Sequence, residues 1–242
     1  MRNYKIEADA RVEFIRQTLK NSRTSAIVFG NSGGKDCALA GILCKMACDN
    51  TLSVMMPCES KQNFLGDMED AIALAGKFNI ENITVDLTKA KLDIIDVISE
   101  VSDAAKANIA PRLRMTTLYT IAQTRNALVC GTGNASERYM GYFTKWGDGA
   151  FDFNPIADLT VTEIYEFLEY FGAPKSIITK APSAGLFEGQ TDEKEMGITY
   201  KEIDNFILNG IKSENYDKIE STHKKTEHKR ILPVLYSKKG SF

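Results

Sequence analysis

The residues best suited to chemistry lie in one short stretch near the start of the chain, from Gly30 to Cys37 (GNSGGKDC). The apolar run Ala26 to Phe29 before it has the length of a buried strand, and Leu39, Ile42 and Leu43 after it recur at helical spacing. The glycines therefore stand on a strand-to-helix turn, where backbone N–H groups at a helix N-terminus face outward. Such a turn is an anion site, and most simply a phosphate site.

The residue after Lys35 distinguishes between known types of phosphate-binding loop. A loop of the G-x-x-x-x-G-K-S/T type needs a hydroxyl there to bind magnesium, and this chain has Asp36 after Lys35. Ordinary γ-phosphoryl transfer is therefore disfavoured, and the G-x-G-x-x-G pattern of dinucleotide-binding folds is absent as well. A glycine-rich turn without a ligand is the alternative, but the flanking strand and helix are the context that a phosphate loop requires.

The loop needs a sheet to hold it, and the chain predicts one. Apolar residues at Ala8, Val12, Ile15 and Leu19 trace an amphipathic opening helix. After it, strands alternate with helices, which implies right-handed crossovers and parallel strands. The predicted strands are Ala26–Phe29, Thr51–Met56, Asn82–Leu87 and Ala127–Cys130, and the helices between them include one traced by Phe64, Met68, Ile72 and Ala75, then Lys89–Ala107 and Pro111–Arg125. We therefore predict an α/β fold with a doubly wound parallel sheet flanked by helices, in a single domain spanning residues 1–242.

A second polar turn, Gly131-Thr132-Gly133-Asn134, follows the fourth predicted strand. Because the carboxyl ends of parallel strands meet at one edge of a sheet, this turn is expected to face the same crevice as the glycine loop. The segment Ala135 to Asn154 then has weak periodicity and many charges, and we expect a long functional loop there.

The C-terminal part contains two helix starts and two polar segments. Thr160–Glu163 and Thr199–Glu202 have capping-box spacing. Lys180 to Gly197 is acidic and contains glycine, and a mobile lid or a plain surface loop are equally good interpretations. The basic run His223 to Arg230 is typical of a solvated helix face.

Composition excludes several classes of protein. The 242 residues are 43% hydrophobic and 26% charged, with no apolar stretch near the roughly 18 residues that a membrane span needs. Five cysteines, an odd number without a C-x-x-C pair, fit reduced thiols. A net charge of −2 gives no sign of a polyanionic partner. We expect a cytoplasmic protein with no membrane or nucleic-acid partner.

Longer motifs carry a resemblance to a known family. Ser32 to Cys37 resembles the SGGxDS loop of the ATP pyrophosphatase superfamily, whose members cleave ATP between the α- and β-phosphates. The following segments resemble ammonia-dependent NAD synthetase within that superfamily, in this order: CGTGNASERYMGYFTKWGDGAFDFNPIADLT, KAPSAGLFEGQTDEKEMGITYKEID and TEHKR. The similarity extends from about Val12 to Arg230.

The resemblance implies a homodimer with an adenine nucleotide alpha hydrolase-like fold and a two-step reaction. The nicotinate carboxylate of deamido-NAD attacks the α-phosphorus of ATP, giving an adenylated intermediate and pyrophosphate, and ammonia then displaces AMP to form NAD. This chemistry needs magnesium, phosphate-binding dipoles and a dry site. Because the synthetase pattern leaves no space for a glutaminase domain, free ammonia or ammonia from a separate partner is the expected nitrogen source.

The resemblance also implies roles for individual residues. Asp36 and Glu137 correspond to magnesium ligands, one from each polar turn. The residues that correspond to deamido-NAD contacts are Arg112, Lys145, Asp152, His228 and Lys229, with Asp152 accepting from a hydroxyl or fixing Lys145. The residues that correspond to ATP contacts are Gly30, Asn31, Ser32, Gly33, Gly34, Lys35, Asp36, Cys37, Thr132 and Ser183.

The chain departs from the family pattern at three positions. Cys37 stands where the family loop usually ends in serine, Val161 stands where a lysine commonly contacts ATP, and Asn31 replaces a small or apolar residue. These departures keep two alternatives open. One is another ATP pyrophosphatase that amidates or thiolates a different substrate, and the other is a nucleotide-binding relative with weakened catalysis.

Overall fold

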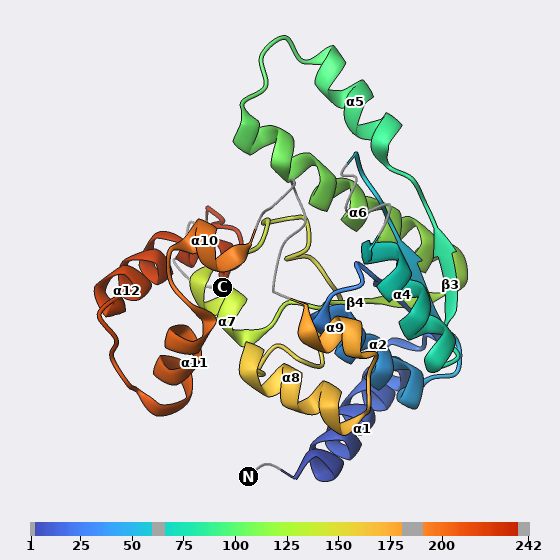
Figure 1. Ribbon diagram of the computed structural model, residues 1–242. Coiled ribbons are helices and arrows are strands. Elements are labelled where there is room, and N and C mark those ends of the chain that lie inside the picture. The colour runs from blue at the N-terminus through green and yellow to red at the C-terminus, as the bar shows by residue number, and fades with distance from the viewer. Residues whose placement is uncertain (1–2, 60–65, 181–190, 237–242) are drawn as a thin grey trace.

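A computed structural model describes residues 3–59, 66–180 and 191–236. Within these ranges, the strands form one parallel sheet in the order β3-β2-β1-β4 (Figure 1). The strands are β1 Ala26–Gly30, β2 Thr51–Met55, β3 Glu81–Thr84 and β4 Ala127–Cys130. Because β1 lies between β2 and β4, the order of the strands reverses there, and the sheet has its switch point between β1 and β4. The predicted doubly wound parallel sheet is confirmed.

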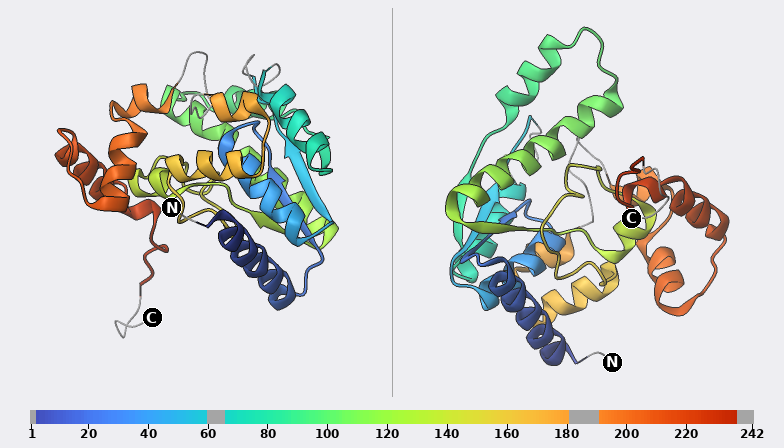
Figure 2. Two further views of the ribbon diagram at one scale, coloured as in Figure 1. Left: turned by 60° about the horizontal axis from the view of Figure 1, so that its bottom comes forward. Right: turned by 180° about the vertical axis from the view of Figure 1, so that it is seen from behind.

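Helices cover both faces of the sheet (Figures 1 and 2). Strand β1 shows why, since Ile27 and Phe29 pack into one apolar core and Val28 packs into the other. The first core is closed by α1 Tyr4–Ser22, α2 Lys35–Ala47, α4 Gly66–Lys77, α8 Val161–Tyr170 and α9 Lys175–Thr179. The second is closed by α6 Asp103–Arg125, with α5 Thr88–Val97 beside it.

The opening helix agrees with its predicted pattern. Ala8, Val12, Ile15 and Leu19 are all buried. The helix begins one residue after Asn3, whose side chain accepts a hydrogen bond from the backbone N–H of Ile6 at 3.2 Å.

The boundary between α5 and α6 differs from the prediction. The break falls at residues 98–102 rather than before Pro111, which lies inside α6. Ser102 begins α6, because its side chain accepts from the N–H of Ala105 at 3.3 Å. Proline removes one helical hydrogen bond, and the packing of α6 along β1 and β4 holds the helix together through it.

The buried face of α4 was predicted only in part: Ala75 is buried as expected and Met68 is half-buried, but Ile72 is not. Ile72 is 53% exposed, whereas Ala71, Leu74 and Ala75 are buried, and Phe64 lies outside the described residues. Leu74 and Ala75 pack into the first apolar core, and the small side chain of Ala71 is buried on the same side of the helix, so the buried face is centred on Leu74 instead of Ile72.

The C-terminal elements form a lobe beside the sheet (Figure 1). They are α10 Asp192–Met196, α11 Tyr200–Asn209, α12 Tyr216–Lys225 and the 3-10 turn η1 Glu227–Lys229. Both predicted capping boxes are present, at the starts of α8 and α11. The predicted lid falls mainly on residues 181–190, outside the described residues, and Ser183 with it. In the parts of the chain that the structure covers, no helix combines the length and apolarity required to cross a membrane.

Candidate active site

The glycine loop between β1 and α2 is held from within by Asn31. The Asn31 Oδ1 accepts from the N–H of Gly33 at 3.1 Å, and its Nδ2 donates to the Ser53 Oγ at 3.0 Å. Gly33 has φ of +72°, and a Cβ there would lie 2.2 Å from the carbonyl oxygen of Asp67, so only glycine fits. No side chain caps α2, which leaves the N–H groups of its first turn for an anion.

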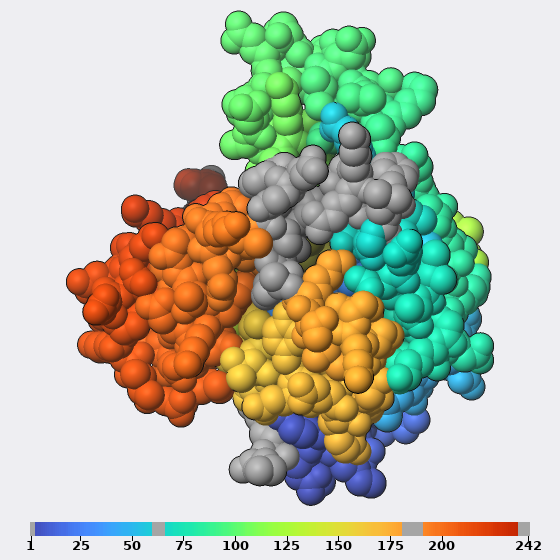
Figure 3. Space-filling model, in the orientation of Figure 1, coloured from blue at the N-terminus to red at the C-terminus, as the bar shows by residue number. Residues whose placement is uncertain are grey.

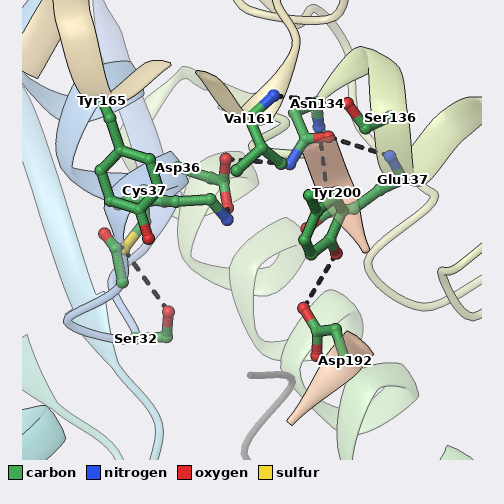
Figure 4. Close-up of polar contacts among 12 residues, drawn as sticks. Ser32, Asp36, Cys37, Asn134, Ser136, Glu137, Val161, Tyr165, Asp192 and Tyr200 are labelled. Carbon is green, nitrogen blue, oxygen red and sulfur yellow. Dashed lines mark hydrogen bonds and ion pairs between the residues drawn. The ribbon is translucent and has the colours of Figure 1, made fainter. Parts of the chain in front are cut away.

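The turn after β4 begins a short helix that the sequence analysis missed, α7 Ala135–Met140. The Asn134 Oδ1 accepts from the N–H of Glu137 at 2.9 Å, and a Glu137 carboxylate oxygen accepts from the N–H of Asn134 at 3.1 Å. The Asn134 Nδ2 donates to the Asp36 Oδ1 at 3.0 Å (Figure 4). The carboxylates of Asp36 and Glu137 are therefore both hydrogen-bonded to Asn134, one to its side chain and one to its backbone, and the predicted meeting of the two polar turns is confirmed.

Lys35 adds a buried cation to this pair. Its Nζ lies 2.7 Å from the Asp36 Oδ2 and 5.6 Å from the centre of the Tyr200 ring. The Tyr200 hydroxyl donates to Asp192 at 2.9 Å (Figure 4). Burial alone would lower the pKa of Lys35, but the charges of Asp36 and Glu137 outweigh it and raise that pKa. Burial and the Asp36 charge raise the pKa of Glu137 well above its usual range.

The C-terminal lobe is fixed to this centre by a buried carboxylate. One Asp204 oxygen accepts from the Ser136 Oγ at 2.5 Å, and the other accepts from the N–H and the hydroxyl of Thr162 at 2.8 and 2.7 Å. Asp204 thereby joins α7, α8 and α11, and α11 carries Tyr200 at its start. The lobe therefore positions the ring that lies against Lys35.

A cavity of about 530 Å³ opens on the two turns. The cavity is lined by both acidic and basic side chains. The acidic lining residues are Asp36, Glu137, Asp67, Asp148, Asp192 and Glu195. The lining cations are Lys35, Arg114, Lys180 and Lys229. Of the residues predicted for ATP and magnesium, those that line the cavity are Gly30, Asn31, Ser32, Gly34, Lys35, Asp36, Cys37, Thr132 and Glu137.

Four of the residues predicted for deamido-NAD lie near one another. An Arg112 nitrogen donates to the carbonyl of Lys145 at 3.4 Å, the Lys145 Nζ donates to the carbonyl of His228 at 2.5 Å, and Lys229 follows in sequence. The Lys229 Nζ donates to the carbonyl oxygens of Gly141 and Phe143, at 2.7 and 2.8 Å, and burial lowers the pKa of Lys229. Among these four, Lys229 lines the cavity.

Asp152 does not join that group. Its Oδ2 accepts from the N–H of Val129 at 2.7 Å and its Oδ1 accepts from the Tyr119 hydroxyl at 3.2 Å. Burial and the Asp152 charge raise the pKa of Tyr119 to about 12. Of the two roles expected for Asp152, fixing Lys145 is wrong, because this carboxylate joins β4 to α6 instead. The other role, accepting from a hydroxyl of the substrate, stays a prediction.

Two of the three positions that depart from the family pattern, Cys37 and Val161, have the following surroundings. The Cys37 Sγ lies 3.1 Å from the carbonyl oxygen of Gly34 and 3.5 Å from the Ser32 Oγ (Figure 4). Burial raises the pKa of the Cys37 thiol. Val161 is buried in the apolar cluster of the C-terminal lobe, and its N–H donates to the Ser136 Oγ at 3.3 Å.

Sequence reasoning missed Asn134, Tyr200, Asp192, Arg114 and Lys180 as lining or positioning residues of this site. Asn134 could have been found, because Asn134 and Glu137 have the spacing of a capping box. The other four carry no local signal, since the tertiary fold alone brings them to the cavity.

The two carboxylates suit a magnesium ion. Mg²⁺ prefers oxygen ligands and is usually held by one or two carboxylates together with substrate phosphates and water. Asp36 and Glu137 supply such a pair beside a phosphate loop. The described residues contain no cluster of three or more His, Cys, Asp or Glu side chains able to hold a metal by themselves.

Comparison with known proteins identifies the family. A family model described as NAD synthase matches residues 7–233. The NH(3)-dependent NAD(+) synthetase of Carboxydothermus hydrogenoformans is 44% identical over 240 residues, covering 96% of this chain and 98% of its own. The NMN synthetase of Francisella tularensis has a TM-score of 0.92 and 38% identity, covering 98% of this chain and 99% of its own. The NH3-dependent NAD synthetase of Campylobacter jejuni has a TM-score of 0.81 and 28% identity, covering 98% and 100%. The chain belongs to the NAD synthase family.

Proposed function

We propose that this chain, a ligase of NAD biosynthesis, uses the cavity between β1 and β4 to make NAD from deamido-NAD, ATP and ammonia. The family supports the reaction and its substrates. The observation that carries the assignment to this cavity is the contact of Asp36 and Glu137 through Asn134, at the junction of two strand ends. Residues 1–242 act as one catalytic domain in this proposal.

ATP binds with its phosphates at the glycine loop. Thr132 and the loop residues Gly30 to Cys37 except Gly33 border the cavity at the start of α2, where backbone N–H groups favour an anion. Ser183 is the further ATP contact expected from the family pattern. Asp36 and Glu137 would hold Mg²⁺, which would neutralise the charge that develops on the leaving pyrophosphate.

The second substrate binds on the side of Lys229. Three more predicted contacts, Arg112, Lys145 and His228, lie close to Lys229 and are linked to one another by hydrogen bonds. The cationic side chains of Arg112 and Lys145 suit the phosphates and the carboxylate of a dinucleotide. Asp152 stays a proposed contact through its position at the end of β4, although two protein donors already use its oxygens.

The reaction forms and breaks one bond in each step. A carboxylate oxygen of deamido-NAD attacks the α-phosphorus, and the bond to the bridging oxygen of pyrophosphate breaks. Ammonia then attacks the adenylated carbonyl carbon, AMP leaves with the bridging oxygen, and the nitrogen loses a proton. The chain's own part is to align the carboxylate with the phosphorus and to exclude water from the mixed anhydride.

The test supplies the purified protein with ATP, Mg²⁺, ammonium and deamido-NAD. We expect NAD, AMP and pyrophosphate in equal amounts. Release of ADP and phosphate would rule out the proposal, because it would place the cleavage at the wrong phosphate. AMP and pyrophosphate released without NAD would instead favour a different acceptor.

A second candidate substrate is nicotinate mononucleotide, the deamidated form of NMN. It is favoured by the TM-score of 0.92 against an NMN synthetase, compared with 0.81 against an NAD synthetase. The chemistry at the carboxylate is the same, and only the adenylate part of the substrate differs. The ratio of kcat/KM for deamido-NAD and nicotinate mononucleotide decides between them, and a ratio below one would overturn the dinucleotide assignment.

The protein works as a homodimer in this proposal. The α5–α6 arm projects from the body (Figures 1 and 3), and it exposes Leu92, Val97 and Ile98. Apolar side chains on a projecting arm are typical of a surface that a second copy covers. The described cysteines are all free thiols, which supports a cytoplasmic location.

A further inference from the structure

Lys35 carries its positive charge at a position where two physical effects oppose a cation. It is the first residue of α2, and a helix N-terminus has a partial positive charge that repels cations. Its side chain is also only 6% exposed, and burial of an ammonium group is unfavourable unless it is paired. A neutral residue would be easier to accommodate at this position. A buried lysine here therefore indicates a function for its charge.

The surroundings of Lys35 supply compensating negative charge. The Asp36 Oδ2 lies 2.7 Å from the Lys35 Nζ, while the Asp36 Oδ1 accepts from Asn134. Asn134 is hydrogen-bonded in turn to Glu137, whose charge also acts on Lys35. The ammonium therefore pairs with Asp36, one of the two carboxylates that suit a magnesium ion, and is influenced by the charge of the other, Glu137.

The other cations of the cavity are committed elsewhere. Lys180 pairs with Asp67 and Asp70 at 2.7 and 2.9 Å, and Lys229 donates to two carbonyl oxygens. The Arg114 Nε donates to the carbonyl of Met56 at 3.1 Å. Among the described lining residues, Lys35 is thus the cation paired with Asp36.

We propose that Lys35 is an internal competitor of the divalent metal at Asp36 and Glu137, and that its ammonium transfers to the ATP phosphates when the metal enters with the nucleotide. Two cations between the same carboxylates repel, so metal alone must displace an ammonium that has no other anion to bind. The triphosphate supplies that anion, and the flexible lysine stem lets the ammonium move to it. Metal and nucleotide then bind with positive coupling.

The experiment measures Mn²⁺ binding by electron paramagnetic resonance, with and without ATP, and measures binding of Mg·ATP by calorimetry. For Lys35→Gln we expect Mn²⁺ alone to bind about tenfold tighter and Mg·ATP to bind about tenfold weaker. Lys35→Arg keeps the charge and should hold Mn²⁺ as weakly as the wild type. A merely structural role for Lys35 would weaken both ligands together, so opposite signs are the diagnostic result.

Lys45→Gln is the matched control, because Lys45 lies in the last turn of the same helix and pairs with Asp49 at 3.7 Å. It should change neither affinity. Lys35→Met, with an apolar stem, repeats the test if the glutamine variant unfolds. Loss of both affinities, or no change in either, would overturn the proposal. The inference rests on the proposed function for the nucleotide, but its Mn²⁺ arm is independent, so failure to form NAD would leave that arm as a separate test.

Discussion

At the scale of single residues, Asn134 joins the start of a helix to the candidate metal site. Its Oδ1 caps α7 and its Nδ2 donates to Asp36. Aspartate, serine and asparagine all cap helices well, but asparagine alone among them carries an acceptor and an NH₂ donor on one side chain. The amide is therefore the side chain that can cap α7 and hold Asp36 at once.

Glu137→Gln should remove activity and leave the fold intact. Glutamine preserves the capping box, but it loses the charge that a metal ligand needs. We expect kcat to fall by about 100-fold or more, with the midpoint of thermal unfolding almost unchanged. Glu202→Gln is the matched control, because Glu202 has the same capping-box position at the start of α11 and does not line the cavity. Equal losses of activity in the two variants would contradict a role for Glu137 as a ligand.

Cys37→Ser should preserve or tighten binding of ATP. The Cys37 Sγ lies close to the Gly34 carbonyl and the Ser32 Oγ, and a hydroxyl there is a better donor than a thiol. Calorimetry should give a dissociation constant for Mg·ATP equal to that of the wild type or lower by no more than about tenfold. Cys48→Ser, outside the cavity, serves as the control. A marked weakening at position 37 would mean that the thiol has a role of its own.

At the scale of elements, the loop between β1 and α2 depends on the helix that packs over it. Gly33 lies against the backbone of Asp67 at the start of α4, and Asp67 also accepts from Lys180 at 2.7 Å. Asp70, one turn along α4, accepts from the same Nζ at 2.9 Å. The orientation of α4 that the sequence pattern missed is thus the one that shapes the phosphate loop and holds Lys180 at the cavity.

Gly33→Ala should destabilise the protein by about 2 kcal/mol or more, because the positive φ and the contact with Asp67 both oppose a Cβ. Gly76→Ala, in the exposed last turn of α4 with open space around its Cβ position, should be neutral or stabilising by up to about 1 kcal/mol. Urea unfolding at equal pH measures both. Similar effects of the two alanines would show that the close approach at Gly33 is unimportant.

At the scale of the whole molecule, the sheet and its two cores form a body from which the α5–α6 arm and the C-terminal segment extend (Figures 1 and 2). Val97 is 80% exposed at the end of α5. Beyond η1, Leu232, Val234 and Tyr236 are exposed as well. Isolated chains rarely leave several large apolar side chains uncovered in this way.

Light scattering should give a mass twice that of the 26.9 kDa chain. Val97→Asp should shift the protein toward the monomer, because a buried unpaired charge at an interface is strongly unfavourable. Ile72→Asp, on exposed α4 away from the arm, should leave the dimer unchanged. A wild-type protein that stays monomeric at micromolar concentration would contradict the proposed dimer.

The parts of the fold that the sequence predicted are those with strong local signals. Strands β1, β2 and β4 were found because buried parallel strands are nearly continuous apolar runs, and the starts of α8 and α11 were found through their capping boxes. Strand β3 was expected at Asn82–Leu87 and is the half-exposed Glu81–Thr84 at the edge of the sheet, so its bounds were predicted only in part. The errors at α4 and around Pro111 come from places where tertiary packing outweighs local preference. In the candidate site, the family resemblance pointed to Asp36 and Glu137, whereas Tyr200 and Asp192 come to the site from a distant part of the chain.

The sequence by itself determined the phosphate loop, the parallel order of strands and helices, and the family to which the chain belongs, because each depends on residue types at short spacing. Only the tertiary structure decided which charges face one another. The Asp152 carboxylate accepts from the backbone of β4 and does not pair with Lys145. Lys35 is buried beside Asp36 and lies against the Tyr200 ring. The physical reason is that electrostatic pairing depends on distance in space, which the packing of α4, α6 and the C-terminal lobe sets.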